Sequence, residues 1–282
     1  MSLLQAVVLA AIQGITELFP ISSLGHAVIL PKLLGWSIDQ HAEGYLPFLV
    51  MLHVGTAAAL LLYFWSDWVG ILLAIFGIGS PAEISDGRRL LARLIVGTVP
   101  AVIIGFLFEK PLRALFSDPA LVAEVLMING VILFVAERLR SRAKANQDLT
   151  TLSLAQALWI GICQAGALIP GLSRSGLTIG AGLGAGLRHD QSAHFSFLLA
   201  APIITGAAVL ELPKLILHHA TGGIGLEVSL VGGLVAGLTA FASVAFLMRF
   251  FRRHEVEALD PFSYYCFLIG AIAVVIFAIG RT

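Results

Sequence analysis

Long runs of apolar residues divide this chain into segments, and within the runs polar positions do not alternate with apolar ones. Several runs reach the roughly 20 residues that a helix needs to cross about 30 Å of hydrocarbon. Continuous runs indicate helices, because a membrane barrel would need alternation. The expected transmembrane helices are 47–65, 90–108, 121–136, 195–212, 226–248 and 262–279. The run 68–79 is too short to cross and is expected at the surface or packed on the bundle.

Two further apolar regions, 3–34 and 154–187, are interrupted in their middle. The interruptions read Phe-Pro-Ile-Ser-Ser at 19–23 and Ile-Pro-Gly-Leu-Ser-Arg-Ser-Gly at 169–176. Proline removes a backbone donor and moves the preceding residue out of helical geometry. Each region is therefore predicted to be a re-entrant helix-break-helix hairpin. Such irregular backbone is tolerated at depth only inside protein or against a watery cavity.

The two halves of the chain, about 1–145 and 150–282, resemble each other weakly. Each half runs as a hairpin followed by three spans, and three is odd, so the second half is expected to run inverted. At an offset of 151 the matching residues are Gln13 with Gln164, Ser22 with Ser173 and Gly25 with Gly176, whereas Pro20 and Pro170 require an offset of 150.

Basic residues set the expected orientation, because cytoplasmic loops carry an excess of Lys and Arg. One side of the predicted topology collects Arg88, Arg89, Arg138, Arg140, Arg142, Lys144, Arg188, Arg249, Arg252 and Arg253, with Arg93 just inside its span. The other side holds Lys32, Lys110, Arg113, Lys214 and Arg281. The first side is expected to be cytoplasmic, so both termini and the entrance of the first hairpin face outward.

The composition agrees with a membrane protein. Of the 282 residues, 58% are apolar and 12% charged, and the mean hydropathy of +0.95 is far above that of a soluble domain. The formal net charge of zero argues against a nucleic-acid partner. We therefore expect one all-α integral membrane domain, residues 1–282, in contact with the bilayer.

Polar residues gather at the first break. Gln13 and Glu17 are four apart and share a helical face, and a carboxylate at this depth is costly unless paired, metal-bound or hydrated. A structural carboxylate capped by hydroxyls is the alternative. Ser22 and Ser23 fall at a helix start, where serines are usually N-caps. Ser23 and His26 are three apart, which suits a nucleophile and its base, although a lone histidine in an apolar stretch is more often packed.

The second break carries Ser173, Arg174, Ser175 and Thr178 among glycines that include Gly171 and Gly176. Arg174 is the sole basic residue in 149–187, too far from either flank to snorkel, and its planar fork suits phosphate oxygens. Glycines allow close backbone approach, and the following helix start offers N–H groups to an anion. If the two breaks meet, the expected occupant is a phosphorylated lipid. A divalent cation is expected at Glu17 and Gln13, Mg²⁺ first and Ca²⁺ as the alternative.

The motifs Gln13-x-x-x-Glu17, Pro20-Ile-Ser-Ser-Leu-Gly-His26 and Pro170-Gly-Leu-Ser-Arg-Ser-Gly176 resemble the signature of undecaprenyl-diphosphate phosphatases, the bacitracin-resistance family. The resemblance covers essentially the whole chain. It implies hydrolysis of undecaprenyl diphosphate to the monophosphate and inorganic phosphate in the bacterial plasma membrane, which recycles the lipid carrier for peptidoglycan synthesis and confers bacitracin resistance. The implied catalytic residues are Glu17, Ser23, His26 and Arg174, and the implied substrate-binding residues are Gln13, Ser22, Gly25, Gly171, Ser173, Ser175, Gly176 and Thr178.

Two positions depart from the family pattern. Gln13 stands where Glu is frequent, which weakens it as a metal ligand, and Leu24 stands where Thr is common. The sequence leaves open a phosphoseryl intermediate or direct attack by water, and it leaves open the oligomeric state, a homodimer included. A carrier of phosphorylated lipids is the competing function, because inverted repeats with broken helices also build transporters. A purely structural scaffold would leave Glu17 and Arg174 unexplained.

Overall fold

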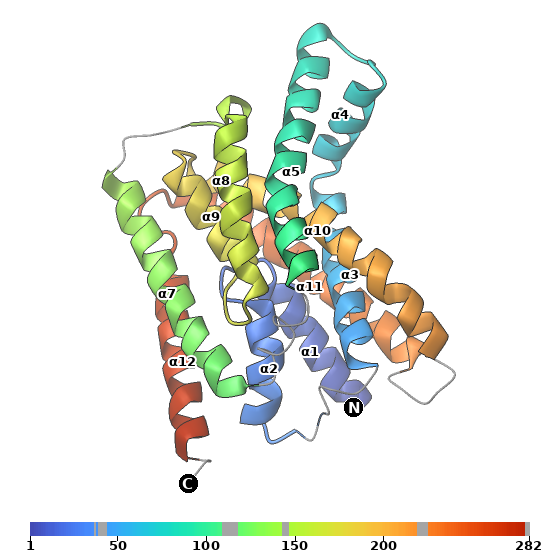
Figure 1. The fold of residues 1–282 in the computed structure, drawn as a ribbon, viewed down its shortest axis with the longest axis vertical. Coiled ribbons are helices and arrows are strands. Elements are labelled where there is room, and N and C mark those ends of the chain that lie inside the picture. The colour runs from blue at the N-terminus through green and yellow to red at the C-terminus, as the bar shows by residue number, and fades with distance from the viewer. Residues whose placement is uncertain (37, 39–43, 109–117, 143–146, 219–224, 280–282) are drawn as a thin grey trace.

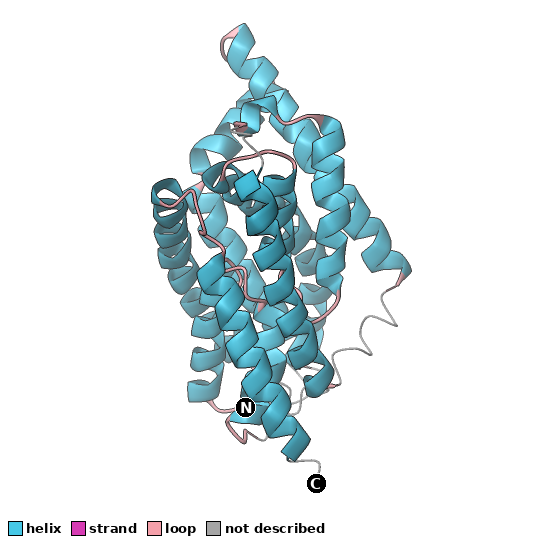
Figure 2. Cartoon of the chain, turned by 90° about the vertical axis from the view of Figure 1, so that its left-hand side faces the viewer, coloured by secondary structure: helices cyan, strands magenta, loops and turns pink. Residues whose placement is uncertain are grey.

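The computed structural model describes residues 1–36, 38, 44–108, 118–142, 147–218 and 225–279. Helices make up nearly all of this part, and no strand occurs within it. They form an elongated bundle, in which some helices, such as α8, follow the long axis and others, such as α1 and α10, cross it obliquely (Figures 1 and 2). The helices are α1 (Leu3–Thr16), α2 (Ser23–Leu33), α3 (Tyr45–Tyr63), α4 (Trp65–Ile75), α5 (Pro81–Leu107), α7 (Pro119–Arg142), α8 (Leu154–Ala165), α9 (Arg174–Gly184), α10 (His189–His218), α11 (Leu226–Arg253) and α12 (Asp260–Ile279), with short 3₁₀ turns at Leu149–Thr151 and Gly166–Leu168.

Five of these helices are long and apolar enough to cross a membrane, which makes the chain a multi-pass membrane protein. They are Tyr45–Tyr63, Pro81–Leu107, Pro119–Arg140, Leu226–Arg253 and Asp260–Ile279. Each contains one of the predicted spans or most of it. The sixth predicted span, 195–212, falls inside α10, which is not one of these five. Of the basic residues that oriented the chain, Lys110, Arg113, Lys144 and Arg281 lie outside the described residues, as do the side chains of Arg142 and Lys214.

Several helix ends differ from the apolar pattern. The fourth helix, α4, is short as expected and packs on α5. Helix α5 begins at Pro81 instead of residue 90, because Ser80 caps it and forms a reciprocal pair of hydrogen bonds with Glu83. Helix α11 continues to Arg253 instead of ending at residue 248. A hydropathy profile ends each predicted span at the first charged residues. The backbone hydrogen bonds of a helix can extend past those residues, so the observed helices are longer.

Glycines bring the helices of the two halves into close contact. A Cβ at Gly55 on α3 would collide with the carbonyl oxygen of Gly233 on α11, and one at Gly161 on α8 with that of Gly97 on α5. Helix α1 packs on α11 in the same way that α8 packs on α5. Small residues at such crossings are typical of membrane bundles, because close packing replaces the hydrophobic effect there.

We expect Gly55→Ala to destabilise the fold by about 1–3 kcal/mol, because the added methyl group must push α3 and α11 apart. Thermal unfolding in detergent measures the change. Gly70→Ala on α4 is the matched control, since a Cβ there meets nothing within 4 Å. Equal melting temperatures for the two variants would contradict the close α3–α11 contact.

Candidate active site

The first break separates α1 from α2. Glu17 still follows α1, since its N–H donates to the carbonyl of Gln13 (2.9 Å), and Pro20 then ends the helical hydrogen bonding. Helix α2 restarts at Ser23, capped by Ser22, whose Oγ accepts from the N–H of Gly25 (3.2 Å). Ser22 has a φ of +70°, a left-handed conformation that is unusual for a residue other than glycine.

The second break precedes α9 and is built in a related way. The N–H of Leu172 donates to the carbonyl of Ile169 (3.2 Å), which closes a turn over Pro170 and Gly171. Gly171 has a φ of +102°, and a Cβ there would also collide with α7. Ser173 caps α9, its Oγ accepting from the N–H of Gly176 (3.1 Å).

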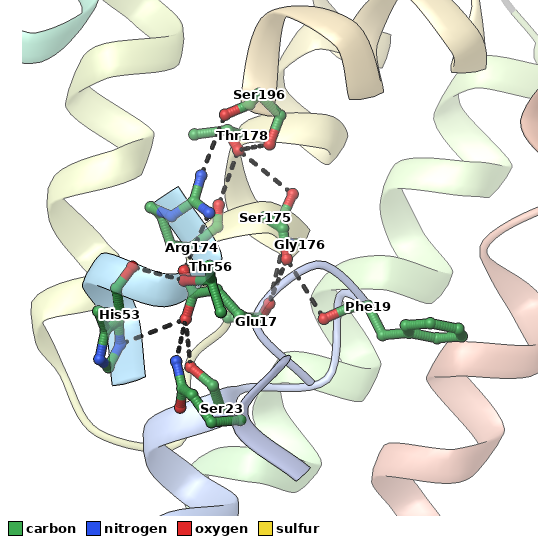
Figure 3. Close-up of polar contacts among 12 residues, drawn as sticks. Glu17, Phe19, Ser23, His53, Thr56, Arg174, Ser175, Gly176, Thr178 and Ser196 are labelled. Atoms are coloured by element: carbon green, nitrogen blue, oxygen red, sulfur yellow. Dashed lines mark hydrogen bonds and ion pairs between the residues drawn. The ribbon is translucent and has the colours of Figure 1, made fainter. Parts of the chain in front are cut away.

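The two breaks lie against each other in the interior of the bundle, as the prolines and polar residues suggested. Asn129 of α7 joins them: its Nδ2 donates to the carbonyl of Pro20 (2.9 Å), and its Oδ1 accepts from the N–H of Ser173 (2.9 Å). The hydroxyl of Ser175 donates to the carbonyl of Phe19 (3.3 Å; Figure 3). The fully buried side-chain amide of Asn129 therefore holds residues of both halves of the chain together.

Glu17 is the centre of the cluster formed where the breaks meet (Figure 3). Its Oε2 accepts from Ser23 Oγ (2.6 Å) and from Gln13 Nε2 (3.1 Å), and it lies 3.3 Å from Nε2 of His53 on α3. Its Oε1 lies 3.0 Å from the terminal nitrogen Nη2 of Arg174. The carboxylate is 7% exposed, so these donors replace the water that a buried charge would otherwise lack.

Arg174 connects the cluster to α10. Its Nη1 donates to the carbonyl of Ser196 (3.0 Å), while its Nε is buried and has no hydrogen-bond partner among the described residues. The hydroxyls of Thr178 and Ser196 are 2.6 Å apart, and Thr178 also donates to the carbonyl of Arg174 (2.7 Å; Figure 3). The guanidinium is therefore held at both terminal nitrogens, and its Nε–H has no partner in the described structure.

His26 lies apart from this cluster. Its Nδ1 is 2.7 Å from the carbonyl oxygen of Ser22 and its Nε2 is 2.8 Å from the hydroxyl of Tyr265 on α12. In the described part of the chain no hydrogen bond joins His26 to Ser23, whose hydroxyl faces Glu17 instead. Ser23 and His26 are thus one turn apart without a direct contact. The group in contact with the Ser23 hydroxyl is the Glu17 carboxylate.

The other residues expected to bind substrate have structural contacts here. Ser22 and Ser173 are N-caps, the ordinary role of serine at a helix start. A Cβ at Gly25 would lie 3.4 Å from Cα of Gly171, so these two glycines allow the breaks to approach. A Cβ at Gly176 would press on Leu133 and Asn129 of α7 (3.2 and 3.3 Å).

Sequence analysis did not single out Asn129, Ser196, Tyr265 or His53 for this site. Each lies on a long helix, far from the break motifs in the sequence. A polar residue inside an apolar run was the one available signal, and that signal is weak because most such residues bond within their own helix.

A divalent cation can be tested against the residues present. Among the described residues no three His, Cys, Asp or Glu side chains converge as they would in an all-protein metal site. Oε1 of Gln13, however, is a buried acceptor without a partner there, and Nε2 of the same amide donates to the Glu17 carboxylate. One carboxylate and one amide oxygen suit Mg²⁺, which usually completes its coordination with substrate phosphates and water. The donor set therefore fits a cation that is shared with a phosphorylated substrate.

Comparison with known proteins identifies the family. The family model of bacitracin resistance protein BacA matches residues 6–272. This chain belongs to that family. Similar curated relatives include undecaprenyl-diphosphatases from Acidiphilium cryptum (50% identity, 99% of this chain and 100% of the relative), Granulibacter bethesdensis (47%; 99% and 98%) and Gluconacetobacter diazotrophicus (49%; 97% and 96%). The family resemblance predicted from the break motifs is thereby confirmed.

The contact between the breaks should depend on Asn129. We expect Asn129→Leu to raise amide hydrogen exchange in the peptide 166–176 and to lower stability by about 1–3 kcal/mol, because the Ser173 N–H and the Pro20 carbonyl lose their buried partner. Exchange followed by mass spectrometry measures this.

Ser263→Ala is the control for that experiment. Ser263 lies on α12, and its hydroxyl donates to the carbonyl of Gly130, the residue that follows Asn129 on α7 (2.7 Å), so the variant removes a buried hydrogen bond to α7 without touching either break. Equal exchange of 166–176 in both variants would show that Asn129 does not hold the breaks together.

Proposed function

We propose that this member of the bacitracin resistance family hydrolyses undecaprenyl diphosphate to undecaprenyl phosphate and inorganic phosphate at the Glu17–Arg174 cluster. The hydrolysis would recycle the lipid carrier for peptidoglycan synthesis and confer bacitracin resistance. The relatives named undecaprenyl-diphosphatase, at about half identity over nearly full length, support the reaction. The observation that supports this site is the ion pair between the two breaks, which puts a guanidinium, a carboxylate and a serine hydroxyl within one contact shell.

The proposed chemistry follows from the contacts that Arg174, Ser23 and Glu17 make. Arg174 offers its unpartnered Nε and a terminal nitrogen to phosphate oxygens, and charge stabilisation of this kind dominates phosphoryl transfer. Ser23 donates to Glu17, so Glu17 is placed to accept the serine proton. Whether Ser23 attacks the phosphorus or holds the water that does, its proton partner is the same carboxylate. His26 is the second proton-transfer group, on the side of α12.

A divalent cation would be held by Glu17 and Gln13, with Mg²⁺ proposed first. When bound, it would neutralise charge on the diphosphate. The amide oxygen of Gln13 is neutral where a second carboxylate would be charged, so we expect moderate affinity for the ion.

Apolar side chains adjoin the reactive groups. Gln13 and Ser23 lie together with Leu9, Ile12, Ala27, Leu49 and Leu52 of α1, α2 and α3, around a space that is too small to admit a water molecule. The isoprene units of the substrate would have to part these side chains to lie beside the reactive groups.

The proposed topology has six spans, with α10 as the sixth, and two re-entrant hairpins in an inverted repeat. The hairpin α1–α2 and the hairpin α8–α9 approach the centre from opposite ends of the bundle (Figure 1). Equivalent serines cap the second helix of each hairpin, and the pairs α1–α11 and α8–α5 correspond under exchange of the halves. By the distribution of basic residues, the site opens toward the outer side of the bacterial plasma membrane and both termini lie outside.

The reaction and the phosphate clamp are tested together by phosphate release from undecaprenyl diphosphate in detergent, without any gradient. We expect Arg174→Gln to reduce kcat/KM by about 100-fold or more, because a charged donor to the transition state is lost. The matched control is Arg188→Gln, which removes an arginine paired with Asp190 outside the site (3.0 Å) and should retain activity. Unchanged turnover in Arg174→Gln would remove the clamp. If the unaltered protein released no phosphate but still moved the lipid diphosphate across vesicle membranes, a carrier function would be favoured.

The cation is tested by chelation. We expect a chelator to abolish phosphate release and Mg²⁺ to restore it, with Gln13→Ala raising the half-saturating Mg²⁺ concentration about tenfold, equivalent to about 1.4 kcal/mol. Gln164→Ala is the control, because this equivalent glutamine donates to the carbonyl of Gly97 (3.1 Å) and does not contact Glu17. Full activity in the presence of chelator would rule the cation out.

A further inference from the structure

Both ring nitrogens of His26 are committed, and the contacts determine where its protons lie. Nδ1 lies 2.7 Å from the carbonyl oxygen of Ser22, which can only accept, so Nδ1 carries a hydrogen. In the neutral ring Nε2 then has a lone pair, and the hydroxyl of Tyr265, 2.8 Å away, donates to it. The two rings also stack, with centroids 5.7 Å apart and an interplanar angle of 18°.

We propose that Tyr265 is a positioning residue of the active site, which holds the ring of His26 in place by donating to Nε2, while the Ser22 carbonyl keeps the hydrogen on Nδ1. This inference rests on the proposed function, in which His26 transfers a proton. The Tyr265 hydroxyl acts through the imidazole and contacts neither Glu17 nor Arg174 in the described structure.

The contact at the other edge of the ring is an ordinary helical one. The carbonyl of Ser22 accepts from the backbone N–H of His26 (3.2 Å) as well as from Nδ1, and His53 and His254 place Nδ1 against a carbonyl four residues earlier in the same way. The imidazole is 7% exposed. What distinguishes His26 from these two is the Tyr265 hydroxyl at Nε2.

The place of Tyr265 in the chain also argues for more than core packing. It lies on α12, 239 positions after His26, and its side chain is 36% exposed. The adjacent Tyr264 is 56% exposed and makes no hydrogen bond to His26. Tyr265 therefore reaches His26 with its hydroxyl as well as its ring, and Tyr264 offers a matched exposed tyrosine that does not.

The experiment compares Tyr265→Phe, which keeps the stacked ring and removes the hydroxyl, with the matched control Tyr264→Phe. We expect Tyr265→Phe to lower kcat for undecaprenyl diphosphate about tenfold, since proton transfer is worth about 10²- to 10⁴-fold and only its positioning is lost. KM should be unchanged, because the phosphate clamp is intact. Tyr264→Phe should match the unaltered protein.

A spectroscopic measurement tests the same contact without turnover. In protein labelled with ¹⁵N at histidine, the His26 signals are identified by their loss in His26→Gln. We expect the unaltered protein and Tyr264→Phe to show a single neutral tautomer protonated at Nδ1. Tyr265→Phe should keep the hydrogen on Nδ1, which the Ser22 carbonyl requires, but shift the Nε2 signal because its hydrogen bond is lost, at an unchanged melting temperature.

The outcomes separate this inference from the proposed function. If Tyr265→Phe matches Tyr264→Phe in both kcat and the His26 spectrum, the positioning role is overturned while the phosphatase stands. A loss of stability with normal kcat per folded molecule would also overturn it, since packing would then be the whole effect. If the unaltered protein releases no phosphate, the proposed function fails, and the spectrum alone still decides whether Tyr265 holds Nε2 of His26.

Discussion

The ion pair between Glu17 and Arg174 is the interaction on which the rest of the site depends. Each charge lies in an apolar bundle, where an unpaired carboxylate or guanidinium would be strongly destabilising. Each comes from a different half of the chain, at a point where proline has ended a helix. The breaks therefore have two roles. They free backbone and side-chain groups for polar contacts, and they allow the two charges to meet. Asn129 then bonds to both breaks and fixes their separation.

Neither half of the chain could build this centre alone. The first hairpin supplies the carboxylate and the serine, and the second supplies the guanidinium. Helix α1 packs on α11 and α8 packs on α5, so each hairpin is supported by a long helix of the opposite half. Glycines such as Gly97 and Gly161 make these supports close. Polar contacts at the centre and small residues at the crossings are therefore parts of one arrangement, since the charges can pair only if the helices around them approach closely.

The breaks and their two charges could be predicted because their causes are local. Proline acts on its own neighbours, and a charge deep in an apolar stretch is costly wherever the chain goes, so Glu17 and Arg174 could be found from the sequence. The partner of Ser23 could not. The three-residue spacing to His26 predicts a contact only if both side chains project from a regular helix. Ser23 is the first residue of α2, and its hydroxyl points back across the break to Glu17. Asn129 contacts residues 44 and 109 positions away, which no local pattern encodes.

The unpaired atoms at the centre favour one kind of occupant over another. Nε of Arg174 is a buried donor without a partner in the described structure, and Oε1 of Gln13 is a buried acceptor in the same condition. Both residues contact Glu17: Gln13 lies on the helix before the first break, and Arg174 begins the helix after the second. An anion alone would satisfy the donor and leave the acceptor facing negative charge. A phosphate that carries its own cation would satisfy both, because the ion would bind the amide oxygen while the phosphate oxygens would bind the guanidinium. These two unpaired atoms are the support for including a cation in the proposed function.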